Sequence, residues 1–264
     1  MKIMTLNLHS YQEDNQLEKF ERIADKIVEM DVDIVCFCEA SQRIDRTYLN
    51  DLIREDNAIK LICDHVNQKA QDHYQFYWDF SHYGFRIYEE GIGILSRKKV
   101  KNIETRFISS TTDPFNFKSR KIMKAVIEGE KEDVNLFSVH LGWGADECES
   151  YYGQLDRLDH WVQEDKQSYN LIAGDFSNDF ATEYYDAIVR KNYIDQYIQA
   201  KPEGSRDYTF INPSGFEFRN SSKVRIDYVF STNDKYKAVD AKRFFLEEDR
   251  VSDHAAVYVE IANL

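Results

Sequence analysis

The sequence predicts a mixed α/β sandwich, with β-sheets inside and helices outside. Strand and helix patterns alternate at the front of the chain, and a series of short strands without helices follows in the middle. Strand-helix units that give way to meanders are typical of packed sheets covered by helices. Hydrophobic residues make up 42% of the 264 residues, which suffices for a sizeable core. No linker divides the chain, so we expect one domain over residues 1–264.

The first elements follow from hydrophobic periodicity. Lys2 to His9 alternates as a strand does, so Asn7 and His9 point the same way. Asn15 and Glu18 resemble a capping box that opens an amphipathic helix. Its apolar stripe consists of Leu17, Phe20, Ala24, Ile27 and Val28. The apolar run from Asp33 to Cys38 predicts a central strand that ends at Glu39.

The middle of the chain predicts a meander. We expect a polar helical piece over Asp45–Glu55 and a loop-rich stretch after it. Strands are expected at Gln75–Phe80, Gly91–Ser96, Arg106–Ser110, Ile122–Glu128 and Val134–His140. Ser150 is expected to cap a helix with an apolar face formed by Tyr151, Leu155, Leu158 and Val162.

The stretch Leu171–Asp179 (LIAGDFSND) predicts a buried strand that delivers polar residues to its end. Gly174 permits a turn or a close backbone approach just before Asp175. Asn178 or Asp179 is expected to cap a helix over about Ala181–Lys191. A short strand at Tyr193–Ile198, a long loop over 199–223, and strands at Val224–Ser231, Ala238–Leu246 and Ala255–Ile261 complete the chain. A loop of that length is usually functional.

Composition limits the classes of function. The formal net charge of −13 means that the surface as a whole repels nucleic-acid backbones and anionic membranes. No run approaches a membrane span or a signal peptide, so we expect a cytoplasmic protein with no membrane partner. The cysteines are too few for a disulfide framework and are expected to be reduced thiols; they are Cys36, Cys38, Cys63 and Cys148.

Polar residues follow strand after strand. They are Asn7, Glu39, His140, Asp175, Asp227, and Asp253 with His254. A single carboxylate at a strand end is usually a turn or cap residue, and a single histidine is usually structural. If the strands lie side by side, however, these residues converge on one rim, and the coincidence favours a catalytic site.

The ordered set of motifs resembles the endonuclease/exonuclease/phosphatase superfamily. The matching pieces are TLNL at Thr5–Leu8, the strand ending in Glu39, SVHL at Ser138–Leu141, GDF at Gly174–Phe176, RIDYVF at Arg225–Phe230 and SDH at Ser252–His254. The resemblance implies a four-layered, DNase I-like α/β sandwich with two packed mixed sheets, and divalent metal-dependent cleavage of phosphate esters.

The resemblance also implies a metal site. Mg²⁺ takes oxygen ligands and few carboxylates, so Glu39 is expected to be a ligand, with Asn7 and Asp253 as companions. Mn²⁺ is the alternative ion. The metal would stabilise charge on the phosphoryl oxygens.

Catalytic roles follow in the same way. His140 and His254 are expected to transfer protons and stabilise the phosphate, and Asp175 to position or deprotonate the attacking water. Asp227 is expected to orient one histidine, and Glu90 is a candidate partner for the other. The alternative for Glu90 is a solvated charge, since Glu89 is adjacent.

One position departs from the family. The family usually has Asn two residues after the Asp of GDF, and this chain has Ser177 there and Asn178 next. A hydroxyl offers one donor where an amide offers two, so the contact to a phosphoryl oxygen would be weaker or water-mediated. Ser177 is the favoured substitute, and Asn178 is the alternative substrate ligand.

A sharper resemblance, to the bacterial branch that includes maltose 6'-phosphate phosphatases, points to a sugar phosphate. It is carried by HLGWGADE at His140–Glu147, YEEGIGILSR at Tyr88–Arg97 and the segment from Tyr208 to Tyr228. Trp143 would offer a flat face to a sugar, and the alternative is that it is a hydrophobic plug of the loop. Arg219 and Arg225 are expected to bind the phosphate or to border the pocket. Arg225 alternates with Asp227 along one strand, so these two residues share a face and are expected to reach the rim. The alternative for each cation is a surface charge that balances neighbouring acids.

Two other functions remain open. A metal-dependent DNA nuclease would use the same chemistry, but the sequence offers no basic run. A weakened binding or regulatory protein would fit the Ser177 departure, although both histidines are present. The expected partner is a small phosphate ester, with nucleic acid second and no obligate protein partner.

Overall fold

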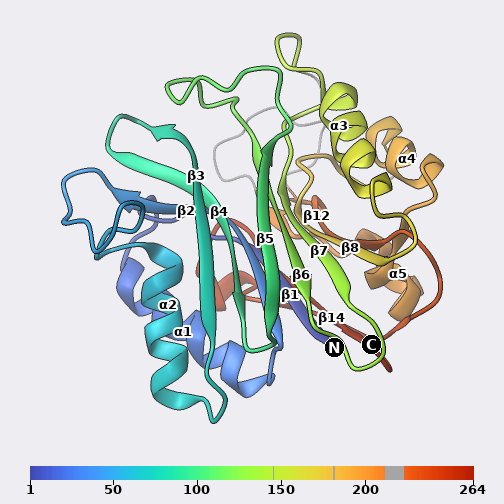
Figure 1. The fold of residues 1–264 in the computed structure, drawn as a ribbon, viewed down its shortest axis with the longest axis horizontal. Coiled ribbons are helices and arrows are strands. Elements are labelled where there is room, and N and C mark those ends of the chain that lie inside the picture. The colour runs from blue at the N-terminus through green and yellow to red at the C-terminus, as the bar shows by residue number, and fades with distance from the viewer. Residues whose placement is uncertain (145, 181, 212–222) are drawn as a thin grey trace.

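The computed structural model describes all residues except 145, 181 and 212–222. Two six-stranded sheets pack face to face. Figure 1 shows α1 and α2 on one side of the paired sheets and α3 and α4 on the other. The helices are α1 Gln16–Glu29, α2 Ala58–Lys69, α3 Tyr151–Gln163, α4 Glu183–Arg190 and α5 Gln196–Ala200. The predicted four-layered sandwich is confirmed.

The first sheet joins the two ends of the described chain. Its strand order is β13 (Ala238–Phe244), β14 (Ala256–Ile261), β1 (Lys2–Asn7), β2 (Ile34–Arg43), β4 (Tyr88–Ser96) and β3 (Gln75–Gly84). Strands β1 and β2 are parallel, and the other pairs are antiparallel. The parallel pair is connected through α1, as a crossover requires.

The second sheet comes from the middle of the chain. Its order is β5 (Val100–Phe107), β6 (Lys121–Ile127), β7 (Val134–His140), β8 (Tyr169–Asp175), β12 (Asp227–Ser231) and β9 (Ile194–Asp195). Strands β7 and β8 are parallel and are connected through α3. A separate ribbon pairs β10 (Phe210–Ile211) with β11 (Lys223–Val224).

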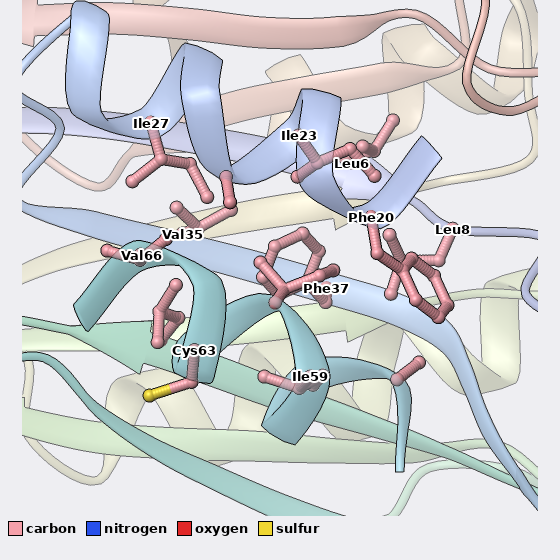
Figure 2. Close-up of a cluster of buried hydrophobic side chains, with 14 of the residues drawn as sticks. Leu6, Leu8, Phe20, Ile23, Ile27, Val35, Phe37, Ile59, Cys63 and Val66 are labelled. Carbon is pink, nitrogen blue, oxygen red and sulfur yellow. The ribbon is translucent and has the colours of Figure 1, made fainter. Parts of the chain in front are cut away.

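Three apolar clusters hold the layers together. One lies between the sheets and includes Ile3, Ile94 and Ala173. A second joins α1 and α2 to the first sheet, and Figure 2 shows Phe20 and Phe37 packed there. The third joins α3 and α4 to the second sheet. Burial on both faces explains why the central strands read as continuous apolar runs.

Several local predictions are wrong. Residues 45–55 form turns closed by a Tyr48–Arg54 bridge, with no helix, and the stretch read as a loop contains α2. Asn15 makes no side-chain cap to α1. Helix α4 is capped by Thr182, which accepts from the Tyr185 amide at 3.3 Å. The short strand after Tyr193 ends at Asp195, where α5 begins.

Other local predictions are confirmed. The Ser150 side chain accepts a hydrogen bond from the Gly153 amide at 3.2 Å and caps α3. All four cysteines are free thiols, and only Cys148 is exposed. Among the described helices, none has the length and apolarity needed to cross a membrane.

Candidate active site

Strand register brings the predicted residues to one edge of the second sheet. His140 ends β7, Asp175 ends the parallel strand β8, and the two are register partners. Strand β12 runs antiparallel to β8 and begins at Asp227, which pairs with Asp175. Because an antiparallel strand presents its start where its neighbour ends, three titratable groups lie side by side at this edge.

Glu39 reaches the site from the first sheet through a β-bulge. Strand β2 continues past Glu39 to Arg43, and its register against β4 shifts between Phe37 and Ala40. Glu39 itself has a φ of 46°. The expectation that the strand ends at Glu39 is therefore wrong. A bulge re-aims a side chain without ending the strand, and here it turns the carboxylate toward the site.

One amide links carboxylates from the two sheets. The Nδ2 of Asn7 donates to Glu39 Oε1 at 2.9 Å and to Asp175 Oδ2 at 3.1 Å. The Nε2 of His140 lies 3.8 Å from Glu39 Oε1 and 3.7 Å from Asp175 Oδ2. Residues far apart in the sequence thus meet in one cluster.

His254 completes this cluster from the last loop. Its Nδ1 lies 2.8 Å from Asp227 Oδ2, and its Nε2 lies 3.8 Å from Asp175 Oδ2. The predicted partnership of Asp227 with a histidine has the geometry it requires. The Asp227 contact fixes the ring and leaves Nε2 facing the cluster.

The two histidines are tuned in opposite directions. Burial, together with the charge of Arg120, holds the pKa of His140 well below its ordinary value. Burial acts against the charged form of His254 too, but the Asp227 and Asp175 carboxylates outweigh it and raise the pKa of His254 to about 10. Burial and the nearby Asp227 carboxylate raise the pKa of Asp175 to about 7. The site therefore pairs a neutral imidazole with a charged one around one carboxyl group.

Comparison with known proteins decides the family. The model of the Endonuclease/Exonuclease/phosphatase family matches residues 4–254. The chain belongs to this family. No curated protein sequence matches it.

Three solved structures illustrate the family's range. An endonuclease/exonuclease/phosphatase family protein from Leptotrichia buccalis C-1013-b has a TM-score of 0.89 and 26% identity, covering 99% of both chains. The Bacteroides thetaiotaomicron mannosyl-6-phosphatase Bt3783 has a TM-score of 0.66 and 18% identity, covering 99% of both. D. rerio TDP2, complexed with single-strand DNA product, has a TM-score of 0.69 and 15% identity, covering 99% of this chain and 98% of its own.

The donor set fits a divalent metal ion of the kind this family uses. The side-chain ligand atoms of Glu39, His140 and Asp175 lie within 4.8 Å of one another. Among the described residues, no Lys or Arg forms an ion pair with either carboxylate, whose recorded charge partners are histidines. Two carboxylates held by a neutral amide and a neutral imidazole leave negative charge that a hard cation would balance.

The expected companions of Glu39 differ in position. The Oδ1 of Asn7 accepts from the His9 amide at 3.1 Å, so in this structure Asn7 holds the carboxylates through its nitrogen. Asp253 lies at the edge of the cluster, with Oδ1 3.7 Å from His9 Nδ1 and 4.0 Å from His254 Nε2. Asp253 thus borders the group formed by Glu39, His140 and Asp175.

Gly174 has the role expected of a close approach. A Cβ there would lie 2.0 Å from the Val139 carbonyl oxygen, and the residue has a φ of 151°. A side chain at this position would push β8 away from β7. The glycine therefore holds Asp175 and His140 in register.

Ser177 and Asn178, which the sequence predicts to contact substrate, form hydrogen bonds within the chain. The Ser177 hydroxyl donates to the Leu141 carbonyl at 2.7 Å, and its amide donates to Asp175 Oδ1 at 2.6 Å. The Asn178 amide donates to the Gly142 and Phe176 carbonyls and accepts from the Gly144 amide. Both residues form hydrogen bonds with the backbone around Asp175 or with its carboxylate, so they position the loop and the carboxylate.

Arg225 is another correction. Its Nη2 donates to Asp195 Oδ2 at 2.6 Å, and its side chain is 2% exposed beneath the aromatic rings of Phe180 and Tyr228. Strand β12 starts only at Asp227, so period-two alternation does not extend back to Arg225. The guanidinium is a structural ion in the core. Arg219 lies outside the described residues.

Glu90 pairs with a histidine that the sequence reading missed. Its Oε1 lies 3.3 Å from Nε2 of His82, the adjacent strand position. Burial and the Glu39 charge raise the pKa of Glu90 to about 8, while burial and the Arg120 charge lower the pKa of His82 to about 4. The structure records no contact between Glu90 and His140. Both shifts favour neutral forms, so Glu90 and His82 form an uncharged pair.

Arg120 is the second residue that sequence reasoning missed. It lines the same cavity as Glu39, Glu90 and His140, and its Nη1 donates to the Phe117 carbonyl. It lies one residue before β6, and its only sequence signal is a cation at the start of a strand. Position at the cavity makes it a candidate phosphate ligand.

Trp143 belongs to a row of rings that ends at His254. Its ring centroid is 6.3 Å from that of Phe210, which is 4.8 Å from the His254 ring. The tryptophan is half-buried. Trp143 is therefore connected to His254 through the ring of Phe210.

Proposed function

We propose that this chain hydrolyses a phosphate monoester of a small sugar, such as maltose 6'-phosphate, by attack of water. One observation carries the proposal: Asp175 lies between two imidazoles, of which the fold keeps one neutral and the other charged. Phosphoryl transfer requires little more of a protein than positioned groups that match the charge of the transition state.

The residues divide the work by their protonation. Asp175 Oδ2 accepts a proton from the attacking water while the new bond to phosphorus forms. The bond to the sugar oxygen breaks, and that oxygen leaves with the bonding electron pair and takes a proton from solvent, so that the free sugar and inorganic phosphate are released. His254, charged at neutral pH and held by Asp227, faces the phosphoryl oxygens. A divalent ion such as Mg²⁺ or Mn²⁺, held by Glu39 with Asp253 at its edge, would supply Lewis-acid stabilisation of the same oxygens.

The choice of a sugar monoester has two supports. The Bacteroides neighbour is by its name a mannosyl-6-phosphatase, and the chain carries a net charge of −13, which disfavours a polyanionic substrate. The second candidate is a DNA nuclease, which the TDP2 complex with single-strand DNA product favours. The proposed partner is a small phosphate ester in the cytoplasm.

Phosphate release tests the proposal directly. The purified protein with Mg²⁺ or Mn²⁺ is expected to release inorganic phosphate from at least one member of a sugar-phosphate panel. Nicking of supercoiled plasmid without phosphate release would favour the nuclease. No activity on either substrate, and no metal binding by calorimetry, would leave a binding protein.

A further inference from the structure

A cavity of about 550 Å³ opens beside the catalytic cluster, and Trp143 is not among its lining residues. Its inner wall includes Glu39, Glu90, Arg120 and His140. Its outer wall comes from the turn between β3 and β4 and from residues 111–119 between β5 and β6, both at the upper end of Figure 1. The wall residues are Tyr83, Phe85, Arg86, Phe115 and Phe117.

The two parts of the outer wall are joined. The Tyr83 amide donates to the Pro114 carbonyl at 2.7 Å, and the rings of Tyr83 and Phe115 stack with centroids 5.1 Å apart at 28°. A hydrogen bond within residues 111–119 stabilises that segment, since Ser119 Oγ donates to the Asp113 carbonyl at 2.7 Å. The wall is therefore formed before any ligand arrives, which lowers the entropic cost of binding.

The turn between β3 and β4 has a conformation that its residues disfavour. The Ile87 amide donates to the Gly84 carbonyl at 2.9 Å, and the two central residues, Phe85 and Arg86, have φ of 50° and 58°. A two-residue turn with both φ positive normally has Asn-Gly. A bulky aromatic and an arginine strain the backbone here, and such strain persists where the side chains serve a function.

The aromatic rings of the wall are unusually exposed. Phe85, Phe115 and Phe117 are 75%, 72% and 65% exposed. Exposed apolar side chains gathered at a cavity mark a binding surface. The lining contains two cations, Arg86 and Arg120, the carboxylate of Glu39, and Glu90, which is uncharged beside His82. An aromatic cavity with the Glu39 carboxylate in its lining suits a neutral ring better than a chain of phosphates.

We propose that this cavity is the leaving-group subsite and that it holds a pyranose ring against the phenylalanines. The phosphoryl group would then lie between Arg120 and the histidines. The inference rests on the proposed function and moves the sugar platform from the Trp143 loop to the Phe85–Phe115 wall. A volume of about 550 Å³ falls within the range of small-molecule sites.

Binding of maltose, which carries no phosphate, tests the subsite without catalysis. Ligand-observed NMR is expected to show maltose bound to the wild-type protein and at least about ten-fold weaker binding to Phe115→Ala. Leu17→Ala, an exposed apolar residue on α1, is the control and should bind normally. Equal binding by Phe115→Ala and wild type, or loss of binding only in Trp143→Ala, would overturn the subsite. Failure of wild type to bind maltose would overturn it as well, even if phosphate release were detected.

A second test measures the kinetics of a variant of the turn between β3 and β4. Phe85→Asn combined with Arg86→Gly should raise the melting temperature, because it relieves the turn, and should raise KM for maltose 6'-phosphate at least about ten-fold. KM for glycerol 3-phosphate, which has no ring, should change less than about two-fold. Equal effects on both esters, or stronger competition by a short DNA oligonucleotide than by maltose, would contradict the inference. Absence of phosphate release from every ester would instead refute the proposed function, and maltose binding would still decide the subsite.

Discussion

At the scale of single residues, the decisive feature is the pair of imidazoles around Asp175. Desolvation dominates at His140, whereas two carboxylates overcome it at His254. Identical side chains therefore have different protonation states a few ångströms apart, which is how one site supplies both a charged and a neutral group at the same pH.

Removing either partner of this arrangement should stop turnover. His254→Ala and Asp175→Ala are expected to lower kcat at least about 10²-fold, the usual contribution of a positioned acid or base. Thermal unfolding by circular dichroism should show that both variants fold. Asp249→Ala, an exposed carboxylate, is the control. Near-normal rates in either site variant would contradict the assigned roles.

His82 predicts a pH dependence of stability. Its pKa in the folded protein, about 4, lies below its ordinary value of 6.5. As pH falls from 6.5 toward 4, the unfolded chain binds a proton that the folded protein refuses, so the free energy of unfolding falls. The loss from this residue is about 3 kcal/mol.

Denaturant titrations between pH 7 and pH 4 would measure this effect. His82→Gln should flatten the decline relative to wild type, while His160→Gln, on an exposed face of α3, should leave it unchanged. Parallel pH profiles for wild type and His82→Gln would show that His82 is protonated in the folded state.

Strand ends were the part of the site that sequence could predict. Asn7, His140 and Asp175 each close a buried strand, and parallel neighbours deliver such residues to one edge. The prediction that Arg225 shares a face with Asp227 is wrong because side chains alternate only within a strand, and β12 begins at Asp227. Arg120 was missed because nothing local distinguishes it from the other cations, and only the folded cavity does.

At the scale of elements, a buried ion pair holds residues 44–54 to β4. Arg54 Nε donates to Glu89 Oε2 at 2.8 Å, and Gln42 and Tyr48 donate to the same carboxylate. Arg54 and Glu89 are 8% and 7% exposed. This network, and not a helix, orders the segment, and side-chain contacts to a distant strand cannot be read from the local sequence.

Breaking this pair on one side should be costly. Arg54→Met leaves the Glu89 carboxylate buried without its cation and should lower the free energy of unfolding by about 3 kcal/mol. The double variant Arg54→Met with Glu89→Met should recover most of that loss. Lys242→Met, which breaks the exposed Lys242–Asp240 pair, should cost less than about 1 kcal/mol. A double variant no more stable than Arg54→Met would argue against the pair as the cause.

Helix α2 has a helical pattern in its sequence, although the sequence analysis predicts a loop-rich stretch there. Ala58, Ile59, Ile62, Cys63 and Val66 form one buried stripe, and Asn57 caps it by accepting from the Lys60 amide at 3.2 Å. The bulge at Glu39 is different in kind, because it is set by pairing with β4 and leaves no mark in the sequence.

At the scale of the whole molecule, net charge separates the two candidate substrates. With a net charge of −13, added salt should screen repulsion of a small anionic ester. Between about 50 and 200 mM salt, kcat/KM for a sugar phosphate should stay constant or rise about two-fold. A nuclease that binds several phosphates would lose affinity by orders of magnitude over the same range. Initial rates at fixed Mg²⁺ measure the slope, and a steep fall would favour the nuclease.

The Asn7 amide bridges the two sheets, since Glu39 comes from one and Asp175 from the other. Asn7 and Glu39 belong to the same sheet, so a slide of one sheet over the other, too small to unpair any strand, would separate the Asn7 amide from Asp175. Low concentrations of urea are therefore expected to abolish phosphate release while the far-ultraviolet circular dichroism spectrum stays unchanged. The rate of phosphate release would then report how well the two sheets are aligned.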